Sequence, residues 1–217
     1  MFPAFPTPKE ILELDLPSDE ESQRSAMQFP HRTGLCGFDV PTPYGTFGLA
    51  ASAFGVSMVF FPRYEGRDVH DRMHRHGTLA WADWGQGRAI GAGIELMEYL
   101  VRERRKFETP VDVSFCTPFA QSVYRALTGV SCGETITYGE LAKLAGHPGK
   151  ARAVGSVLRS NPCPIFVPCH RVLSASGELG GWSGPPGWKE GLLRLEGVLP
   201  RPAAAEQTRA TEFVSVP

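Results

Sequence analysis

The sequence predicts a mixed α/β protein of the α+β kind, with a sheet in its first half and helices in its second. Two apolar runs at residues 46–54 and 56–61, broken at Gly55, have the length and the turn signal of a β-hairpin packed on one face. The second half instead carries helix-capping residues ahead of apolar side chains at helical spacing. A short stretch at 108–112 separates the two patterns, and we place a domain boundary there.

This change of texture divides the 217 residues into four segments. Residues 1–33 are acidic and rich in proline, and we expect a flexible arm there. Residues 34–110 are expected to form an N-terminal α/β support domain, which includes a helix over 91–107 with Ile94, Met97 and Val101 on one side. Residues 113–200 are expected to form the second domain, and residues 201–217 a disordered tail.

The first helix of the second domain is predicted from Thr117 at the N-cap and Pro118 at the first helical position, and Gly129 is expected to stop it. Its apolar face repeats at a spacing of four residues: Phe119, Val123 and Leu127. Further on, Thr137 and Glu140 match a capping box. We expect this box to open a helix over 138–145, which buries Leu141 and Leu144 and ends at Gly146.

A further helix is predicted over 150–160, after a turn at 147–149. Two short helices joined by a tight, glycine-containing turn form a helix-turn-helix arrangement. Polar side chains share one face of the second helix: Arg152, Ser156 and Arg159. Because Gly155 and Ser156 are small, a nucleic-acid backbone or groove floor is able to approach closely; the alternative is an ordinary amphipathic surface helix.

The charge is unevenly distributed, although the formal net charge is only -1. Residues 150–194 carry six basic and two acidic side chains, a balance of +4, which leaves -5 for the remainder. This asymmetry is typical of a protein with one surface facing nucleic acid, although a basic solvated surface is the alternative.

The five cysteines are an odd number and include no CxxC pair. Cys163 and Cys169 lie in a proline-rich stretch that we expect to be extended, so that roughly 20 Å would separate them, too far for a disulfide. Reduced thiols favour a cytoplasmic protein. We expect neither a signal peptide nor a membrane span.

The residues with the clearest chemistry lie in the run NPCPIFVPCHRV at 161–172. Its three prolines stiffen the backbone that carries Cys169, and the apolar surroundings raise the pKa of such a thiol. A base is then needed to form the nucleophilic thiolate, and His170 is the nearest candidate. Neighbours in a strand point to opposite faces, so either the backbone turns at Cys169 or a water bridges the pair. A buried structural cysteine is the alternative.

With its context, this run resembles the O6-alkylguanine-DNA alkyltransferases. The resemblance rests on VPCHRV at 167–172, GETITYGELAKLAG at 133–146, ARAVGSVLRSNP at 151–162, GWSG at 181–184 and KEGLLRLEG at 189–197. It implies a ribonuclease-H-like N-terminal domain followed by a winged helix-turn-helix domain. It also implies an enzyme that moves the methyl or other alkyl group of O6-alkylguanine, and of O4-alkylthymine, irreversibly onto its own cysteine in a single turnover.

The resemblance assigns the catalytic roles residue by residue. Cys169 is the alkyl acceptor, and His170 takes its proton through a water. Glu196, in a predicted helix over 191–196, orients His170. Tyr138 rotates the 3′ phosphate and can protonate the guanine N3.

The DNA contacts implied by the resemblance fall on the predicted second helix of the helix-turn-helix. This helix enters the minor groove of double-stranded DNA containing O6-alkylguanine, and Arg152 fills the place of the flipped nucleotide. Gly155, Ser156 and Arg159 complete the DNA-binding set, and Asn161 is the hinge between this helix and the active-site run.

A pocket for the base is also implied. The backbones of Cys169, Val172 and Ser183 would recognise the guanine edge, with Pro164 and Trp182 as its walls. Trp182, flanked by glycines, would serve as a lid. Lys189 matches a lysine near the pocket, and its alternative is a solvent-facing charge.

No cofactor and no metal are expected, and the protein is expected to act as a monomer. His31 and Cys36 do not complete a zinc site, and the arginines between His70, His74 and His76 would repel a cation. Two other functions remain open: a helix-turn-helix regulator or damage reader in which Cys169 is incidental, and a Cys-His hydrolase.

Overall fold

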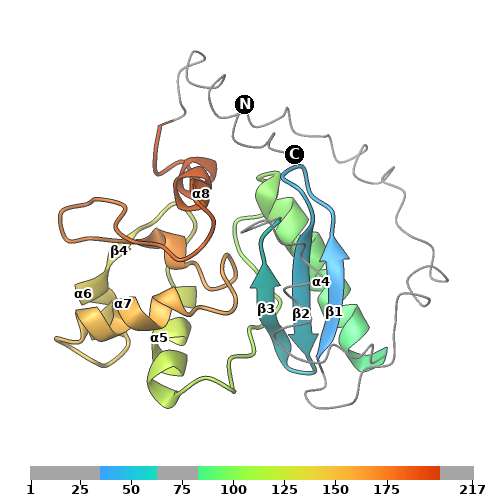
Figure 1. The fold of residues 1–217 in the computed structure, drawn as a ribbon, viewed down its shortest axis with the longest axis horizontal. Helices are drawn as coiled ribbons and strands as arrows, with labels where there is room; N and C mark the ends of the chain where they lie inside the picture. Colours follow the sequence, from blue (N-terminus) through green and yellow to red (C-terminus); the bar gives the residue numbers. More distant parts are fainter. Residues whose placement is uncertain (1–34, 63–82, 201–217) are drawn as a thin grey trace.

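The computed structural model describes residues 35–62 and 83–200, shown in colour in Figure 1. Several expectations fall outside this part of the chain, namely the arm at 1–33, the tail at 201–217, His31 and the three histidines between 70 and 76. The same holds for the side chain of Cys36. No helix within the described ranges is long and apolar enough to cross a bilayer.

The first half is a three-stranded antiparallel sheet packed against one long helix (Figure 1). The strands are β1 (Cys36–Val40), β2 (Phe47–Ser52) and β3 (Gly55–Phe60), and they lie in that order. The predicted hairpin is therefore confirmed as β2 and β3, whereas β1 was not predicted. Every residue of β2 is buried, because the helix α4 (Asp83–Leu100) contacts all three strands.

Helix α4 begins and ends earlier than the predicted range of 91–107. Its end is set by Arg102, whose φ of 67° is left-handed, while the Arg102 and Glu103 amides donate to the carbonyls of Tyr99 and Glu98. This is a Schellman ending without its usual glycine, and so the sequence gives no stop signal. The predicted apolar side is also wrong in part, because Ile94 is 54% exposed and Val101 lies beyond the helix.

The second half is helical, with α5 (Pro118–Thr128), α6 (Tyr138–Leu144), α7 (Ala151–Arg159) and α8 (Trp188–Glu196). The start of α5 is confirmed: Thr117 accepts from the Ala120 amide and Pro118 opens the helix. Gly129 ends it, with its amide bonded to the carbonyls of Ala126 and Leu127. Two of the predicted apolar residues, Val123 and Leu127, are fully buried, and Phe119 packs partly buried against the core.

Helix α6 opens with the predicted capping box, in which Thr137 and Glu140 each bond the other's backbone amide. Leu141 is fully buried, but Leu144 is 60% exposed, so that part of the prediction is wrong. Ala142, next to Leu141, takes the buried position instead. The boundary of this helical face cannot be read from spacing alone, since Leu144 falls within the same 3.6-residue period.

Helix α7 follows α6 after a short turn, and the two helices pack against each other. Val154 and Leu158 face the core, while the polar residues of the predicted face are exposed: Arg152, Ser156 and Arg159. The assignments as ribonuclease-H-like and winged helix-turn-helix domains remain predictions.

Two short strands connect the start of α6 to the segment that carries Cys169. β4 (Ile136–Thr137) pairs in parallel with β5 (Val172–Leu173), and a 3₁₀ turn, η1 (Cys169–Arg171), immediately precedes β5. Because β4 leads directly into α6, this pairing places the start of α6 beside the segment that carries Cys169.

The edge of β3 is where the two halves meet. Val56 exchanges hydrogen bonds with the Pro110 carbonyl and the Asp112 amide, and the Val59 amide donates to the Pro162 carbonyl. One continuous apolar core therefore runs from the sheet to the helices.

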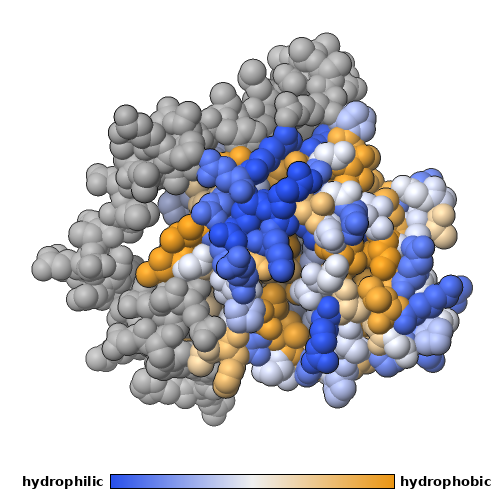
Figure 2. Space-filling model, turned by 180° about the vertical axis from the view of Figure 1, so that it is seen from behind, coloured by the Kyte–Doolittle hydropathy of each residue, from blue (hydrophilic) through white to orange (hydrophobic). Residues whose placement is uncertain are grey.

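The surface opposite the view of Figure 1 carries its most continuous hydrophilic patch near the centre of that face (Figure 2). A domain boundary at 108–112 remains a prediction.

Candidate active site

Cys169 is carried by a compact turn rather than by the extended stretch that the prolines suggested. The Val167 amide donates to the Cys163 carbonyl at 2.8 Å, and Ile165 has a left-handed φ of 76°. This expectation was wrong because Ile165, Phe166 and Val167 turn inward together and are almost fully buried. Cys116, Cys132, Cys163 and Cys169 are free, as expected.

Asn161 ties the end of α7 to this turn. Its side-chain amide donates to the Val167 carbonyl at 2.9 Å, and its side-chain oxygen accepts from the Cys163 amide at 3.0 Å. A single side chain thus bonds both ends of the turn, which supports the predicted role of Asn161 as the link between α7 and Cys169.

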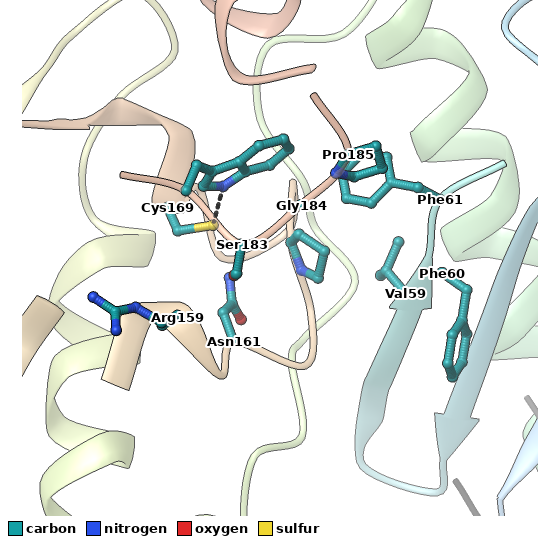
Figure 3. Close-up of a pocket in the computed structure, with 11 residues that line it drawn as sticks. Val59, Phe60, Phe61, Arg159, Asn161, Cys169, Ser183, Gly184 and Pro185 are labelled. Atoms are coloured by element: carbon teal, nitrogen blue, oxygen red, sulfur yellow. Dashed lines mark hydrogen bonds between the residues drawn. The ribbon is translucent and has the colours of Figure 1, made fainter. Parts of the chain in front are cut away.

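A cavity of about 200 Å³ opens at Cys169 (Figure 3). Besides Cys169, five of the residues that line it were predicted for the pocket or for DNA contact: Arg159, Asn161, Pro164, Trp182 and Ser183. The side of the cavity formed by the end of β3 was not predicted: it consists of Val59 and Phe60 of β3 and of Phe61, which follows the strand. No local signal marks these residues, because an apolar strand end reads as core whether or not a cavity lies against it.

Trp182 lies directly over the thiol. Its indole N–H donates to Cys169 Sγ at 3.2 Å, the bond drawn in Figure 3, and its ring meets Phe61 edge-on with centroids 5.5 Å apart. Cys169 is consequently only 4% exposed. Trp182 therefore covers the sulfur while its ring also contacts Phe61, the residue after β3.

His170 and Glu196 form the buried pair that the sequence predicted. The backbone turns at Cys169, where the 3₁₀ turn η1 begins, and the alternative of a water that bridges Cys169 and His170 stays a prediction. His170 Nε2 lies 2.9 Å from Glu196 Oε1, and both side chains are fully buried. His170 Nδ1 is also buried and has no hydrogen-bond partner among the described residues.

Three further residues hold Glu196, and none of them was predicted. Arg171 donates from Nε to both carboxylate oxygens at 3.1 Å and from Nη2 to Oε1 at 2.8 Å. The Tyr99 hydroxyl, from α4, donates to Oε1 at 2.6 Å. The Gly133 amide donates to Oε2 at 3.2 Å. The sequence offered no signal, because Arg171 reads as surface charge and Tyr99 as helix core.

Burial and hydrogen bonding set the ionisation of the site. Burial raises the pKa of the Cys169 thiol, although the Trp182 and Asn161 hydrogen bonds and the Lys189 charge act against it. Burial lowers the pKa of His170, in spite of Glu196. Burial would raise the pKa of Glu196, but the hydrogen bonds from His170 and Arg171 hold it far below its usual value. At neutral pH the site therefore contains a thiol, a neutral imidazole and a carboxylate.

Lys189 is buried, with 5% of its surface exposed, so the alternative of a solvent-facing charge is wrong. Its ammonium donates to the Val172 carbonyl at 2.7 Å and to the Leu179 carbonyl. Burial lowers its pKa, and the proximity of Cys169 acts in the opposite direction. Lys189 thus braces the segment after Cys169 and puts a positive charge near the sulfur, whereas neither Lys189 nor Val172 lines the cavity.

Tyr138 opens α6 between α7 and the Trp182 segment. Its hydroxyl donates to the Gly181 carbonyl at 3.4 Å. A Cβ at Gly155 would lie 3.7 Å from the Tyr138 ring, an ordinary van der Waals contact, so Gly155 of α7 faces this ring directly. Burial, with a smaller contribution from Cys169, raises the pKa of Tyr138, which therefore stays a neutral proton donor.

A buried thiol at a cavity, next in the chain to a buried imidazole–carboxylate pair, is typical of proteins that react through their own cysteine. Comparison with known proteins narrows this class. Residues 118–198 match the family model described as 6-O-methylguanine DNA methyltransferase, DNA binding domain. A methylated-DNA–protein-cysteine methyltransferase of Shigella flexneri is 34% identical over 166 residues, which cover 74% of this chain and 94% of that protein. Another, from Salmonella typhimurium, is 41% identical over 140 residues, covering 62% and 82%.

Solved structures agree with the sequences. The crystal structure of a Mycobacterium tuberculosis O6-methylguanine methyltransferase superposes with a TM-score of 0.62 at 33% identity, over 80% of this chain and 99% of that one. A Mycobacterium tuberculosis OGT crystallised in complex with DNA gives a TM-score of 0.60 at 35% identity, over 74% and 91%. The chain belongs to the methylated-DNA–protein-cysteine methyltransferase family.

Proposed function

We propose that this protein repairs DNA by moving the alkyl group of O6-alkylguanine, and of O4-alkylthymine, onto Cys169. The observation that carries the proposal is the Cys169 thiol at a cavity, followed directly in the chain by a buried imidazole whose orientation Glu196 fixes. The relatives carry the name of this activity. Each molecule acts once, because the product is a thioether that no group at the site can cleave.

The orientation of His170 decides which nitrogen is the base. The Glu196 carboxylate is ionised and accepts from Nε2, so the ring proton lies on Nε2 and the lone pair lies on Nδ1. Nδ1 is the buried atom without a partner among the described residues, and a bridging water there would connect it to the Cys169 thiol. His170 is therefore suited to take the thiol proton.

The transfer then balances in bonds and protons. The Cys169 proton passes to His170, and the thiolate sulfur bonds the alkyl carbon while the bond from that carbon to O6 breaks. The base leaves as neutral guanine if it receives a proton, and Tyr138, the neutral phenol at the start of α6, is our candidate donor. His170 keeps the thiol proton until solvent removes it.

The partner we propose is double-stranded DNA, bound by a monomer through its minor groove. Arg152 and Ser156 are exposed on α7, and Arg159 of the same helix lines the cavity. One helix face thus leads from the surface to Cys169. Since the reacting atom is hidden within a paired stack, the nucleotide must be flipped out, and Arg152 would take its place.

Intact-mass analysis tests the proposal. The protein is incubated with a duplex containing O6-methylguanine, and we expect a stable gain of one methyl group, located on Cys169 by peptide mapping. Cys169→Ala should gain nothing. Tight binding with an unchanged mass would favour a regulator or damage reader, and turnover of an ester substrate would favour a hydrolase; either result would overturn transfer.

The role of Arg152 is tested by comparing two substrates. Arg152→Ala is expected to slow repair of duplex DNA by about 10- to 100-fold, the order of a lost stacking contact, and to change repair of the free methylated base less than twofold. The rates are measured by single-turnover kinetics. Arg125→Ala, which removes an exposed charge from α5, is the matched control. Equal losses on both substrates would remove the flipping role.

A further inference from the structure

Tyr99 brings the first half of the chain into the reactive site. It belongs to α4, is 2% exposed, and donates its hydroxyl to Glu196 Oε1 at 2.6 Å. The Tyr99 hydroxyl oxygen also lies 3.4 Å from His170 Nε2. Tyr99 therefore contacts both members of the pair that prepares Cys169, although α4 lies in a different half of the molecule (Figure 1).

Aromatic packing fixes the position of this hydroxyl. The Tyr99 ring contacts Phe107 with centroids 5.3 Å apart, and Phe107 contacts Phe166 at 4.3 Å. Phe166 lies within the turn that supports Cys169. The ring of Tyr99 is thus held by the same cluster that supports the nucleophile, and its hydroxyl has little freedom to leave Glu196.

The hydrogen-bond directions are settled by the charges around Glu196. Burial and the neighbouring Glu196 charge raise the pKa of Tyr99 well above its usual value, so Tyr99 is a neutral phenol with one proton to donate. His170 Nε2 carries a proton and donates it to Glu196 Oε1, so Nε2 cannot accept from Tyr99. The Tyr99 hydroxyl therefore donates to Oε1 as well. Glu196 Oε1 therefore accepts from Tyr99 on α4 and from two residues of η1, His170 and Arg171.

We propose that Tyr99 is a positioning residue through which the first half of the chain holds Glu196 and His170 in the arrangement that takes the Cys169 proton. This rests on the proposed function. A donor that competes with His170 for Oε1 spreads the carboxylate charge, so the imidazolium is stabilised less and His170 stays a free base at neutral pH. Without the hydroxyl, the charge of Glu196 acts more strongly on His170, and protonated His170 persists to higher pH.

Tyr99→Phe removes the hydroxyl and keeps the ring. We expect the single-turnover rate of methyl transfer at neutral pH to fall about tenfold, the order of one lost hydrogen bond to a charged group. We also expect the acid limb of the pH–rate profile to move to higher pH. Besides Tyr99, the titratable and charged groups around this pair are Arg171 on η1, Lys189 on α8 and Cys132 before β4, and all are unchanged in the variant.

Tyr124→Phe is the matched control. Tyr124 is also 2% exposed, and its hydroxyl donates to the Val157 carbonyl at 2.9 Å, away from Glu196. Its pH–rate profile should coincide with that of the wild type. Rates are normalised to the methyl gained at completion, which counts only folded, active molecules.

Two outcomes would overturn the proposal. One is a Tyr99→Phe profile equal to that of the wild type; the other is an equal loss of rate at every pH, which reports a general structural defect. Failure of the proposed function is seen separately, because the wild-type protein would then gain no methyl group at all.

Discussion

Replacing His170 with glutamine is expected to slow methyl transfer by about 10²- to 10⁴-fold, the contribution of a positioned general base. The side-chain amide of glutamine can still donate to Glu196, so the buried carboxylate keeps a partner. It cannot accept a proton as the imidazole does. Because burial raises the pKa of the Cys169 thiol, little thiolate forms at neutral pH without a base.

The pH dependence separates a lost base from a damaged fold. Burial lowers the pKa of His170 from its ordinary 6.5, so wild-type His170 is unprotonated throughout the neutral range and the rate should be flat there. In His170→Gln the reacting species is the small fraction of thiolate, which grows about tenfold per pH unit below the thiol pKa. The variant's rate should therefore rise steadily with pH.

Rapid-quench single-turnover measurements between about pH 6 and 8.5 check both expectations. His147→Gln is the control, since His147 bonds Ser122 at 2.9 Å, away from the site, and should leave the rate unchanged. A His170→Gln rate that stays close to the wild-type value and is flat with pH would mean that another group removes the thiol proton.

The elements that the sequence predicted well are those with local signals. The N-cap of α5 at Thr117, the capping box of α6 and the polar face of α7 depend on residues three or four positions apart, and all three are confirmed. Where a helix ended without such a signal, the prediction failed. Arg102 stops α4 in a left-handed conformation that usually requires glycine, and no pattern of side chains announces it.

The residues of the site likewise fall into those with a signal in the local sequence and those brought together only by the fold. Cys169 and His170 were predicted because they stand together in a conspicuous run, and Glu196 was assigned through the family resemblance. Tyr99 lies 97 positions from Glu196 in sequence, and the contact exists only because α4 packs behind the turn that carries Cys169. The β3 side of the cavity was missed for the same reason: Phe61 becomes a pocket residue only when Trp182 is placed beside it.

Arg171 was missed for a different reason, which concerns free energy. A charged side chain is rarely buried unless it is paired, so a lone arginine in the sequence is expected at the surface. Here it is 5% exposed because Glu196 and the Val130 carbonyl satisfy its donors. The pair cannot be recognised until both partners are known to be inside.

Replacing Arg171 with methionine is accordingly expected to lower the free energy of unfolding by about 3–5 kcal/mol, the cost of removing one partner from a buried ion pair. Methionine fills much of the space but leaves the Glu196 carboxylate without its main cation and the Val130 carbonyl without its donor. Denaturation in urea at neutral pH measures the loss. A loss under about 1 kcal/mol would show that water reaches this pair.

Acidification should shrink the difference between this variant and the wild type. In the wild type the pKa of Glu196 is far below its ordinary 4.5, so the stabilisation is complete above that value and is lost only as the pH falls through the folded-state pKa. In Arg171→Met, burial of Glu196 is no longer outweighed, and Glu196 or His170 takes up a proton in the folded state as the pH falls from 7 to about 5. That proton offsets the unpaired negative charge of Glu196 and recovers part of the lost free energy of unfolding.

Arg194→Met is the control for both measurements. Arg194 bonds Glu190 at 2.6 Å, but this pair is partly exposed, with 29% and 41% of the two side chains accessible. Its removal should cost at most about 0.5 kcal/mol, and the cost should stay the same at the two pH values. A pH-independent loss in Arg171→Met would mean that the unpaired carboxylate is stabilised by other donors, with Tyr99 and Gly133 the nearest candidates.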